Sequence, residues 1–161
     1  MIDKAGTRKY LRAMKRLNIC LLLSILALSF TLGLSGSAWA GEVQEANAGR
    51  CGENLDCKSL LVPGKVTVIE FYSPFCFPCL LLAPLLEKLS QSRPELSVKK
   101  LNINRPEVQG IDWLSPLAQQ YELRSVPYFT IFNPQGKLVA EGSAALQQIE
   151  RWLREAKILK E

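Results

Sequence analysis

The fold is decided by one stretch, Lys65-Val66-Thr67-Val68-Ile69-Glu70-Phe71-Tyr72-Ser73-Pro74-Phe75-Cys76-Phe77-Pro78-Cys79. Its first half follows a Pro63-Gly64 turn and is rich in β-branched and aromatic residues, which predicts a buried central strand. Its second half opens an apolar segment that predicts a helix to about Gln91, with Pro84 inside it. The two cysteines therefore lie where a buried strand turns into a helix.

Outward from this stretch, strands and helices alternate. Strands are predicted over residues 96–103, 128–132 and 137–141, and the last two form a hairpin around the turn at 133–136. Ser115-Pro116 begins a helix that ends near Tyr121, and Ser143 caps a final helix. The apolar stripe of that last helix consists of Leu146, Ile149, Trp152, Leu153 and Ala156. The pattern predicts an α/β fold with a central mixed β-sheet flanked by helices.

Residues 1–40 have the layout of a secretory signal peptide. A basic start ends at Lys15 and Arg16, an apolar run covers residues 17–34, and the small residues around Ala38 and Ala40 fit a cleavage site after Ala40. We therefore expect a periplasmic or secreted protein. The apolar run of about 18 residues is also long enough to remain as a membrane anchor, which is the alternative.

Charge and composition exclude several classes of function. The chain has a formal net charge of +5, but the basic excess lies in residues 1–40 and the remainder is formally neutral. No basic surface for nucleic acid is expected. The chain has no histidine, which excludes histidine-based catalysis, histidine-containing zinc sites and the C-x-x-C-H haem attachment.

The motif Cys76-Phe77-Pro78-Cys79 indicates thiol chemistry. A thiol at a helix N-terminus faces unsatisfied N–H groups, which stabilise its thiolate. The two-residue gap lets the second thiol attack a mixed disulfide formed at the first. Cys76 is the expected nucleophile and Cys79 the expected resolving thiol. By itself, a C-x-x-C pair also fits half of a metal site or a structural disulfide.

The chain resembles the thioredoxin family over roughly residues 58–158. The resemblance rests on five anchors in the family's order: the strand that runs into the cysteine motif, Pro84, the strand at 98–103, the dipeptide Val126-Pro127, and Gly142. It implies a thioredoxin-like fold and no cofactor or metal beyond the redox-active disulfide. It also implies a cis Pro127, which base rates alone do not predict.

The resemblance assigns further residues to the site. Glu70 stands where the family places a buried acid beneath the second cysteine, and a buried carboxyl group has the raised pKa that suits a proton acceptor for Cys79. Lys100 falls at the position of the lysine that partners this acid. The alternative is that both are ordinary surface charges.

The substrate-binding residues are expected to be Phe75, Phe77, Pro78, Val126 and Pro127. Phe75 replaces the family's usual tryptophan and Leu80 replaces a basic residue, so the rim of the site is unusually apolar. Such a surface suits an unfolded chain, an apolar partner loop or a membrane-bound reductant.

Two more cysteines, Cys51 and Cys57, precede the motif. We predict a structural disulfide between them; a second redox pair and a four-cysteine metal site are the alternatives. The predicted organisation is a signal peptide at 1–40, an N-terminal lead with this pair at 41–57, flexible over 41–49, and a thioredoxin-like domain at 58–161.

The sequence thus predicts an extracytoplasmic, monomeric enzyme that reduces or isomerises disulfides of exported proteins, recharged by a membrane-bound or soluble thiol reductant. Pro78 before the resolving cysteine favours reduction. The alternative is a non-catalytic binding module, or a carrier that holds copper or zinc through its cysteines.

Overall fold

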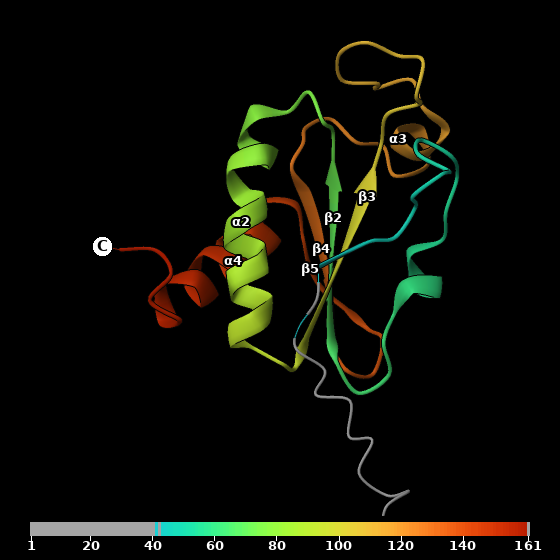
Figure 1. Cartoon of the computed structure of the whole chain (residues 1–161). Helices are drawn as coiled ribbons and strands as arrows, with labels where there is room; N and C mark the ends of the chain where they lie inside the picture. The colour runs from blue at the N-terminus through green and yellow to red at the C-terminus, as the bar shows by residue number, and fades with distance from the viewer. Residues whose placement is uncertain (1–40, 42, 161) are drawn as a thin grey trace, which may run out of the picture. The chain divides into compact units, whose positions relative to one another are not determined.

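The computed structural model of the chain describes residues 41 and 43–160, so the predicted signal peptide or anchor at 1–40 lies outside the described residues. A five-stranded sheet forms the centre, with strands in the order β1-β3-β2-β4-β5 (Figure 1). These strands are β1 (Val43–Glu45), β2 (Val66–Tyr72), β3 (Leu96–Asn102), β4 (Tyr128–Phe132) and β5 (Leu138–Glu141). β1 and β2 each pair in parallel with β3, whereas β4 pairs antiparallel with β2 and with β5. The predicted α/β class with a mixed sheet is confirmed.

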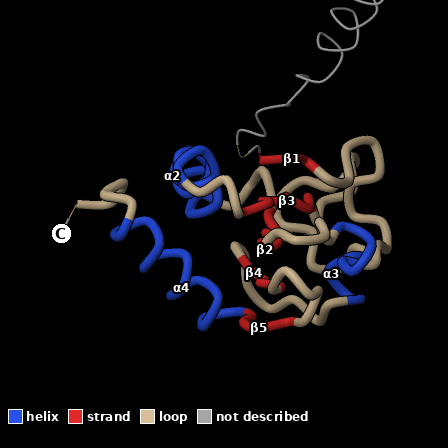
Figure 2. Tube along the Cα trace, turned by 90° about the horizontal axis from the view of Figure 1, so that it is seen from below, coloured by secondary structure: helices blue, strands red, loops and turns tan. Residues whose placement is uncertain are grey.

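Helices cover both faces of this sheet. α2 (Phe77–Ser92) and α4 (Gly142–Glu155) lie on one face, and α3 (Pro116–Gln120) lies on the other (Figure 2). The short 3-10 helix η1 (Cys57–Leu60) packs into the same core as α3. No helix in the described part of the chain is long and apolar enough to cross a membrane.

The alternation of side chains along β2 divides the core in two. Val68 packs with Leu86 and Leu89 of α2 and with Ile149 and Leu153 of α4. The neighbouring residues Ile69 and Phe71 point the other way and pack against α3. Glu70 shares its face with Val68, so the fold places this acid under α2, on the side of the cysteines.

The helix and turn signals in the sequence are borne out with one exception. Ser115 caps α3, because its hydroxyl accepts from the Ala118 N–H, and Asn133 organises the hairpin turn by accepting from two backbone N–H groups. Ser143 is not a cap: α4 begins at Gly142 directly after β5, and its N-cap Glu141 makes no side-chain cap hydrogen bond. The helix begins earlier because the chain passes from strand to helix without a loop.

The prediction of a flexible lead at residues 41–49 is wrong. Val43–Glu45 forms the edge strand β1, which pairs in parallel with β3. Gly41 is buried, and a Cβ atom at this position would lie 1.9 Å from the Ser90 carbonyl oxygen of α2. β1 forms because it pairs with β3, and Gly41 packs against α2. The composition of a three-residue polar strand does not predict these contacts.

Candidate active site

A tight turn delivers the two motif cysteines from β2 to α2. Ser73 is buried after the end of β2, its hydroxyl accepts from the Phe75 N–H at 3.1 Å, and its carbonyl oxygen accepts from the Cys76 N–H at 3.1 Å. Cys76 is the N-cap of α2, and its sulfur accepts from the Cys79 N–H at 3.2 Å. Cys76 therefore occupies the helix N-terminus that the sequence predicts.

Cys76 and Cys79 form a disulfide, with Cα atoms 5.3 Å apart. Both are buried, Cys76 being only 3% exposed. The neighbouring apolar residues are exposed instead: the exposed fraction is 68% for Phe77 and 55% for Leu80. Phe75 and Leu81 are also exposed. The redox pair is therefore recessed within an apolar rim, and the other predicted rim residue, Pro78, is exposed as well.

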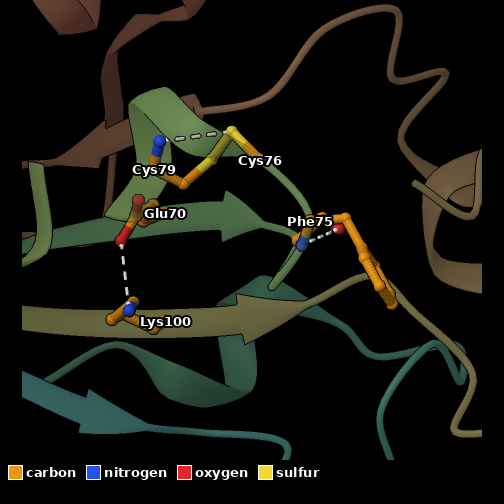
Figure 3. Close-up of a disulfide and its surroundings, with 6 residues drawn as sticks. Glu70, Phe75, Cys76, Cys79 and Lys100 are labelled. Atoms are coloured by element: carbon orange, nitrogen blue, oxygen red, sulfur yellow. Dashed lines mark hydrogen bonds and ion pairs between the residues drawn. A yellow bond between two sulfur atoms is a disulfide. The ribbon is translucent and has the colours of Figure 1, made fainter. Parts of the chain in front are cut away.

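Glu70 lies beneath the disulfide, beside Cys79, and points toward Lys100 on β3 (Figure 3). Its side chain is fully buried, and the Lys100 ammonium nitrogen is 4.0 Å from its Oε2 atom. Within the described part of the chain, neither carboxylate oxygen of Glu70 has a hydrogen-bond partner. The structure thus brings Glu70 and Lys100 together, as the resemblance implies. Their separation is long for an ion pair.

The electrostatics of Glu70 favour proton transfer near neutral pH. Burial raises its pKa from 4.5 to about 7, and the Lys100 charge only partly opposes this effect. A carboxyl group with this pKa exchanges its proton readily at neutral pH, as a general base beneath a thiol requires.

The Val126–Pro127 peptide bond is cis, as the resemblance implies. Pro127 directly precedes β4, whose first residue Tyr128 pairs with Phe71 near the end of β2. Because β4 runs antiparallel to β2, the proline lies at the same end of the sheet as the turn that carries the cysteines. Val126 is half-buried against the core on the α3 face.

The structure does not form the predicted disulfide between Cys51 and Cys57, because both are free thiols among the residues it describes. Cys57 is buried at the start of η1, where its N–H donates to the Tyr121 hydroxyl, and burial raises its thiol pKa to about 11. Cys51 is half-buried, and its thiol lies 3.6 Å from the Asn47 carbonyl oxygen near β1. The two thiols thus have different surroundings, one in the core on the α3 face and one by the edge strand.

Two polar residues beside Glu70 are absent from the sequence-based site. The Glu45 charge on β1 adds to the rise in the pKa of Glu70 that burial causes, and the Tyr72 ring on β2 contacts the Lys100 ammonium group. Tyr72 could have been found, since it lies two residues beyond Glu70 on the same face of one strand. Glu45 could not, because nothing in its sequence context marks β1 as a strand.

The described residues, 41 and 43–160, hold no group of three or more histidine, cysteine, aspartate or glutamate side chains that could bind a metal ion. The site itself consists of the Cys76–Cys79 disulfide with the buried Glu70 carboxyl group beneath it.

Comparison with known proteins agrees with this chemistry. The model of the thioredoxin family matches residues 57–155. Thioredoxin-1 of Saccharomyces cerevisiae is 30% identical over 93 residues, which cover 56% of this chain and 82% of that protein. A thioredoxin of Chlamydia pneumoniae is 34% identical over 50% of this chain and 69% of its own length. A barley (Hordeum vulgare) protein disulfide-isomerase is 29% identical over 58% of this chain and 17% of its own length.

Solved structures support the fold. Short-form thioredoxin f from spinach chloroplast superposes with a TM-score of 0.50 at 25% identity, covering 75% of this chain and 98% of that one. A mutant thioredoxin from Halobacterium salinarum gives a TM-score of 0.51 at 23% identity, covering 78% and 97%. The thioredoxin-like fold expected from the sequence is thereby confirmed.

Proposed function

Because the chain belongs to the thioredoxin family, we propose that it acts outside the cytoplasm and reduces disulfides of exported proteins. Its activity as a thiol-disulfide oxidoreductase follows from the family together with the Cys76–Cys79 pair. The location outside the cytoplasm and the reductive direction of the reaction are the proposed parts. The observation that carries the activity is the disulfide at the N-terminus of α2 above the buried Glu70.

In the proposed reaction, the Cys76 thiolate attacks one sulfur of a substrate disulfide and releases the other as a thiolate, which takes up a proton. The Cys79 thiol then gives its proton to the Glu70 carboxylate and attacks the Cys76 sulfur, which releases the second substrate sulfur. Two electrons pass from the cysteine pair to the substrate, and the pair ends as the disulfide seen in the structure. No cofactor other than this disulfide is required. A thiol reductant restores the dithiol by the reverse exchange.

The apolar rim supports a substrate whose disulfide is flanked by apolar residues. Phe75, Phe77, Leu80 and Leu81 are exposed around a recessed sulfur pair, so a partner has to press against them to reach Cys76. Removing such apolar surface from water favours the complex, although the buried area does not set the affinity by itself. Pro78 completes the rim, and the backbone at Val126 and cis Pro127 offers hydrogen bonds to the bound segment.

The reductive direction predicts a low reduction potential. We expect the Cys76–Cys79 pair, equilibrated with glutathione or dithiothreitol redox buffers, to lie nearer to the value of about −270 mV for thioredoxin than to that of about −120 mV for a strong oxidant. Quantitative thiol labelling measures the fraction of the Cys76–Cys79 pair that is reduced in each buffer. The double variant with Cys51→Ser and Cys57→Ser is the control. A value near that of the strong oxidant would contradict the reductive direction.

The compartment predicts a defined mature N-terminus. In a bacterial host that exports the chain, N-terminal sequencing should find Gly41 first, because the small residues at Ala38 and Ala40 fit the cleavage site. Ala40→Phe should block this cleavage while leaving the apolar run unchanged. Full-length chain in the membrane fraction of the unaltered protein would support the anchor at 17–34 instead, and retention in the cytoplasm would contradict export.

A further inference from the structure

Three charged residues form a row across the sheet beneath the redox site. Glu45 on β1 lies opposite Lys100 on β3, and Lys100 lies opposite Glu70 on β2. Residues paired across neighbouring strands project to the same face, and adjacent strands are about 4.8 Å apart. The two acids are therefore about 10 Å apart at their backbones, with the lysine between them.

Lys100 contacts two residues of β2, the strand on one side of it. Its ammonium nitrogen is 4.0 Å from the Oε2 atom of Glu70 and 4.0 Å from the centre of the Tyr72 ring. Burial raises the pKa of the Tyr72 hydroxyl, and the nearby Glu45 raises it further. The outer acid thus acts on the tyrosine whose ring contacts Lys100, and the same lysine faces the inner acid.

Exposure falls steeply along this row. Glu45 is exposed on the edge strand, Lys100 and Tyr72 are half-buried, and Glu70 is fully buried. An exposed carboxylate keeps its charge at neutral pH, whereas a buried one loses hydration when it ionises. The exposed Glu45 carboxyl group therefore lies on the solvent side of Lys100, opposite to the side on which the buried Glu70 lies.

Among the residues that the structure describes, Lys100 is the cation that forms an ion pair with Glu70. Cys79 of α2 faces Glu70 as a neutral sulfur, and the Tyr72 phenol carries no positive charge in either of its protonation states. The Glu45 charge also raises the pKa of Glu70, against the lowering effect of Lys100. In the described part of the chain, Lys100 is thus the cation that lies between the two acids.

We propose that Glu45 is a positioning residue of the redox site: from the edge strand it lies opposite Lys100 and weakens the attraction of this lysine for the Glu70 carboxylate. β1 then has a function besides closing the sheet, because it carries the charge that adjusts the proton acceptor of Cys79. The inference rests on the proposed function only in this last step, the use of Glu70 as that acceptor.

The test follows the protonation of Glu70 directly in the purified, oxidised protein. Carbon-13 NMR of the glutamate side chains gives the pH midpoint of the Glu70 carboxyl group, whose signal is identified by its loss in Glu70→Gln. We expect Glu45→Gln to lower this midpoint by about half a pH unit, the effect of removing one charge about 10 Å away at a partly buried site. Glu45→Asp, which keeps the charge, should restore most of the original midpoint.

The matched control is Glu122→Gln, which removes an exposed carboxylate next to α3 on the opposite face of the sheet and should leave the midpoint unchanged. If Glu45 only helps β1 to pair, Glu45→Gln will reduce stability equally at all pH values without moving the midpoint, and the proposal is wrong. The readout involves no substrate. A shifted midpoint with an unchanged pH profile of disulfide reduction would uphold the row and contradict the role of Glu70 in the proposed reaction.

Discussion

Cys76→Ser is expected to abolish disulfide reduction, and Cys79→Ser is expected to accumulate mixed disulfides with its natural partners. The asymmetry arises because Cys76 caps α2 and faces the N–H groups of its first turn, whereas Cys79 lies inside the helix above Glu70. A thiolate is stabilised at the first position and not at the second. Cys79→Ser can therefore still attack, but it cannot release the attached substrate.

The measurement combines alkylation with trapping. In the reduced protein, iodoacetamide should modify Cys76 at pH values well below those needed for a free thiol, while Cys79 stays unmodified. Non-reducing electrophoresis of the Cys79→Ser protein, followed by mass spectrometry of the trapped bands, identifies the substrates. We expect these partners to carry apolar residues next to the captured cysteine, because Phe77 and Leu80 surround the site.

The matched control removes the other two thiols. Cys51→Ser and Cys57→Ser together should retain activity, since both cysteines are free thiols and neither belongs to the Cys76–Cys79 disulfide. Trapping through Cys79 in the Cys76→Ser protein would reverse the assignment. Loss of activity on removing Cys51 and Cys57, with activity retained when the motif cysteines are replaced, would also contradict it.

The sequence predicts those parts of the fold whose signals are local. β2, α2, β4 and the apolar stripe of α4 follow from strand composition, turn residues and helical periodicity, and the structure has them within a few residues of the predicted bounds. The position of Cys76 follows in the same way, because a strand, a tight turn and a helix are adjacent in the chain.

The parts that the sequence could not supply depend on partners distant in the chain. β1 is a strand because β3 offers it a free edge, with Glu45 opposite Lys100, and no property of Val43–Glu45 predicts that pairing. Cys51 and Cys57 look like a pair by count and compartment, yet one lies by β1 and the other against Tyr121. The row from Glu45 to Glu70 depends on the strand order β1-β3-β2, so the sequence alone does not predict it.

The second large effect is expected from the burial of Glu70. Its pKa is about 7 in the folded chain against 4.5 for an ordinary glutamate, so the folded state binds more protons than the unfolded state between these values. The free energy of unfolding therefore falls as the pH rises from about 4.5 to about 7. Above that pH, the stabilising contribution of the neutral Glu70 is fully lost. A difference of this size corresponds to about 3 kcal/mol.

Glu70→Gln should remove this pH dependence, because the amide stays neutral. Relative to the unaltered protein, its free energy of unfolding should improve by about 3 kcal/mol between pH 4 and pH 8. Urea denaturation of the oxidised proteins at a series of pH values gives this difference. A constant offset from burying an amide with no partner, about 1–3 kcal/mol, does not affect the comparison because it is the same at every pH.

The control is Glu87→Gln, which removes an exposed carboxylate from the same helix that carries Cys79 and should leave the pH dependence as it is. If Glu70→Gln follows the unaltered protein at every pH, then Glu70 is ionised in the folded chain without a penalty. Its carboxylate would then be paired more closely with Lys100 than the 4.0 Å separation allows, and it could not serve as a proton acceptor tuned to neutral pH. The stability measurement on a single variant thus tests the same carboxyl group on which the resolving step depends.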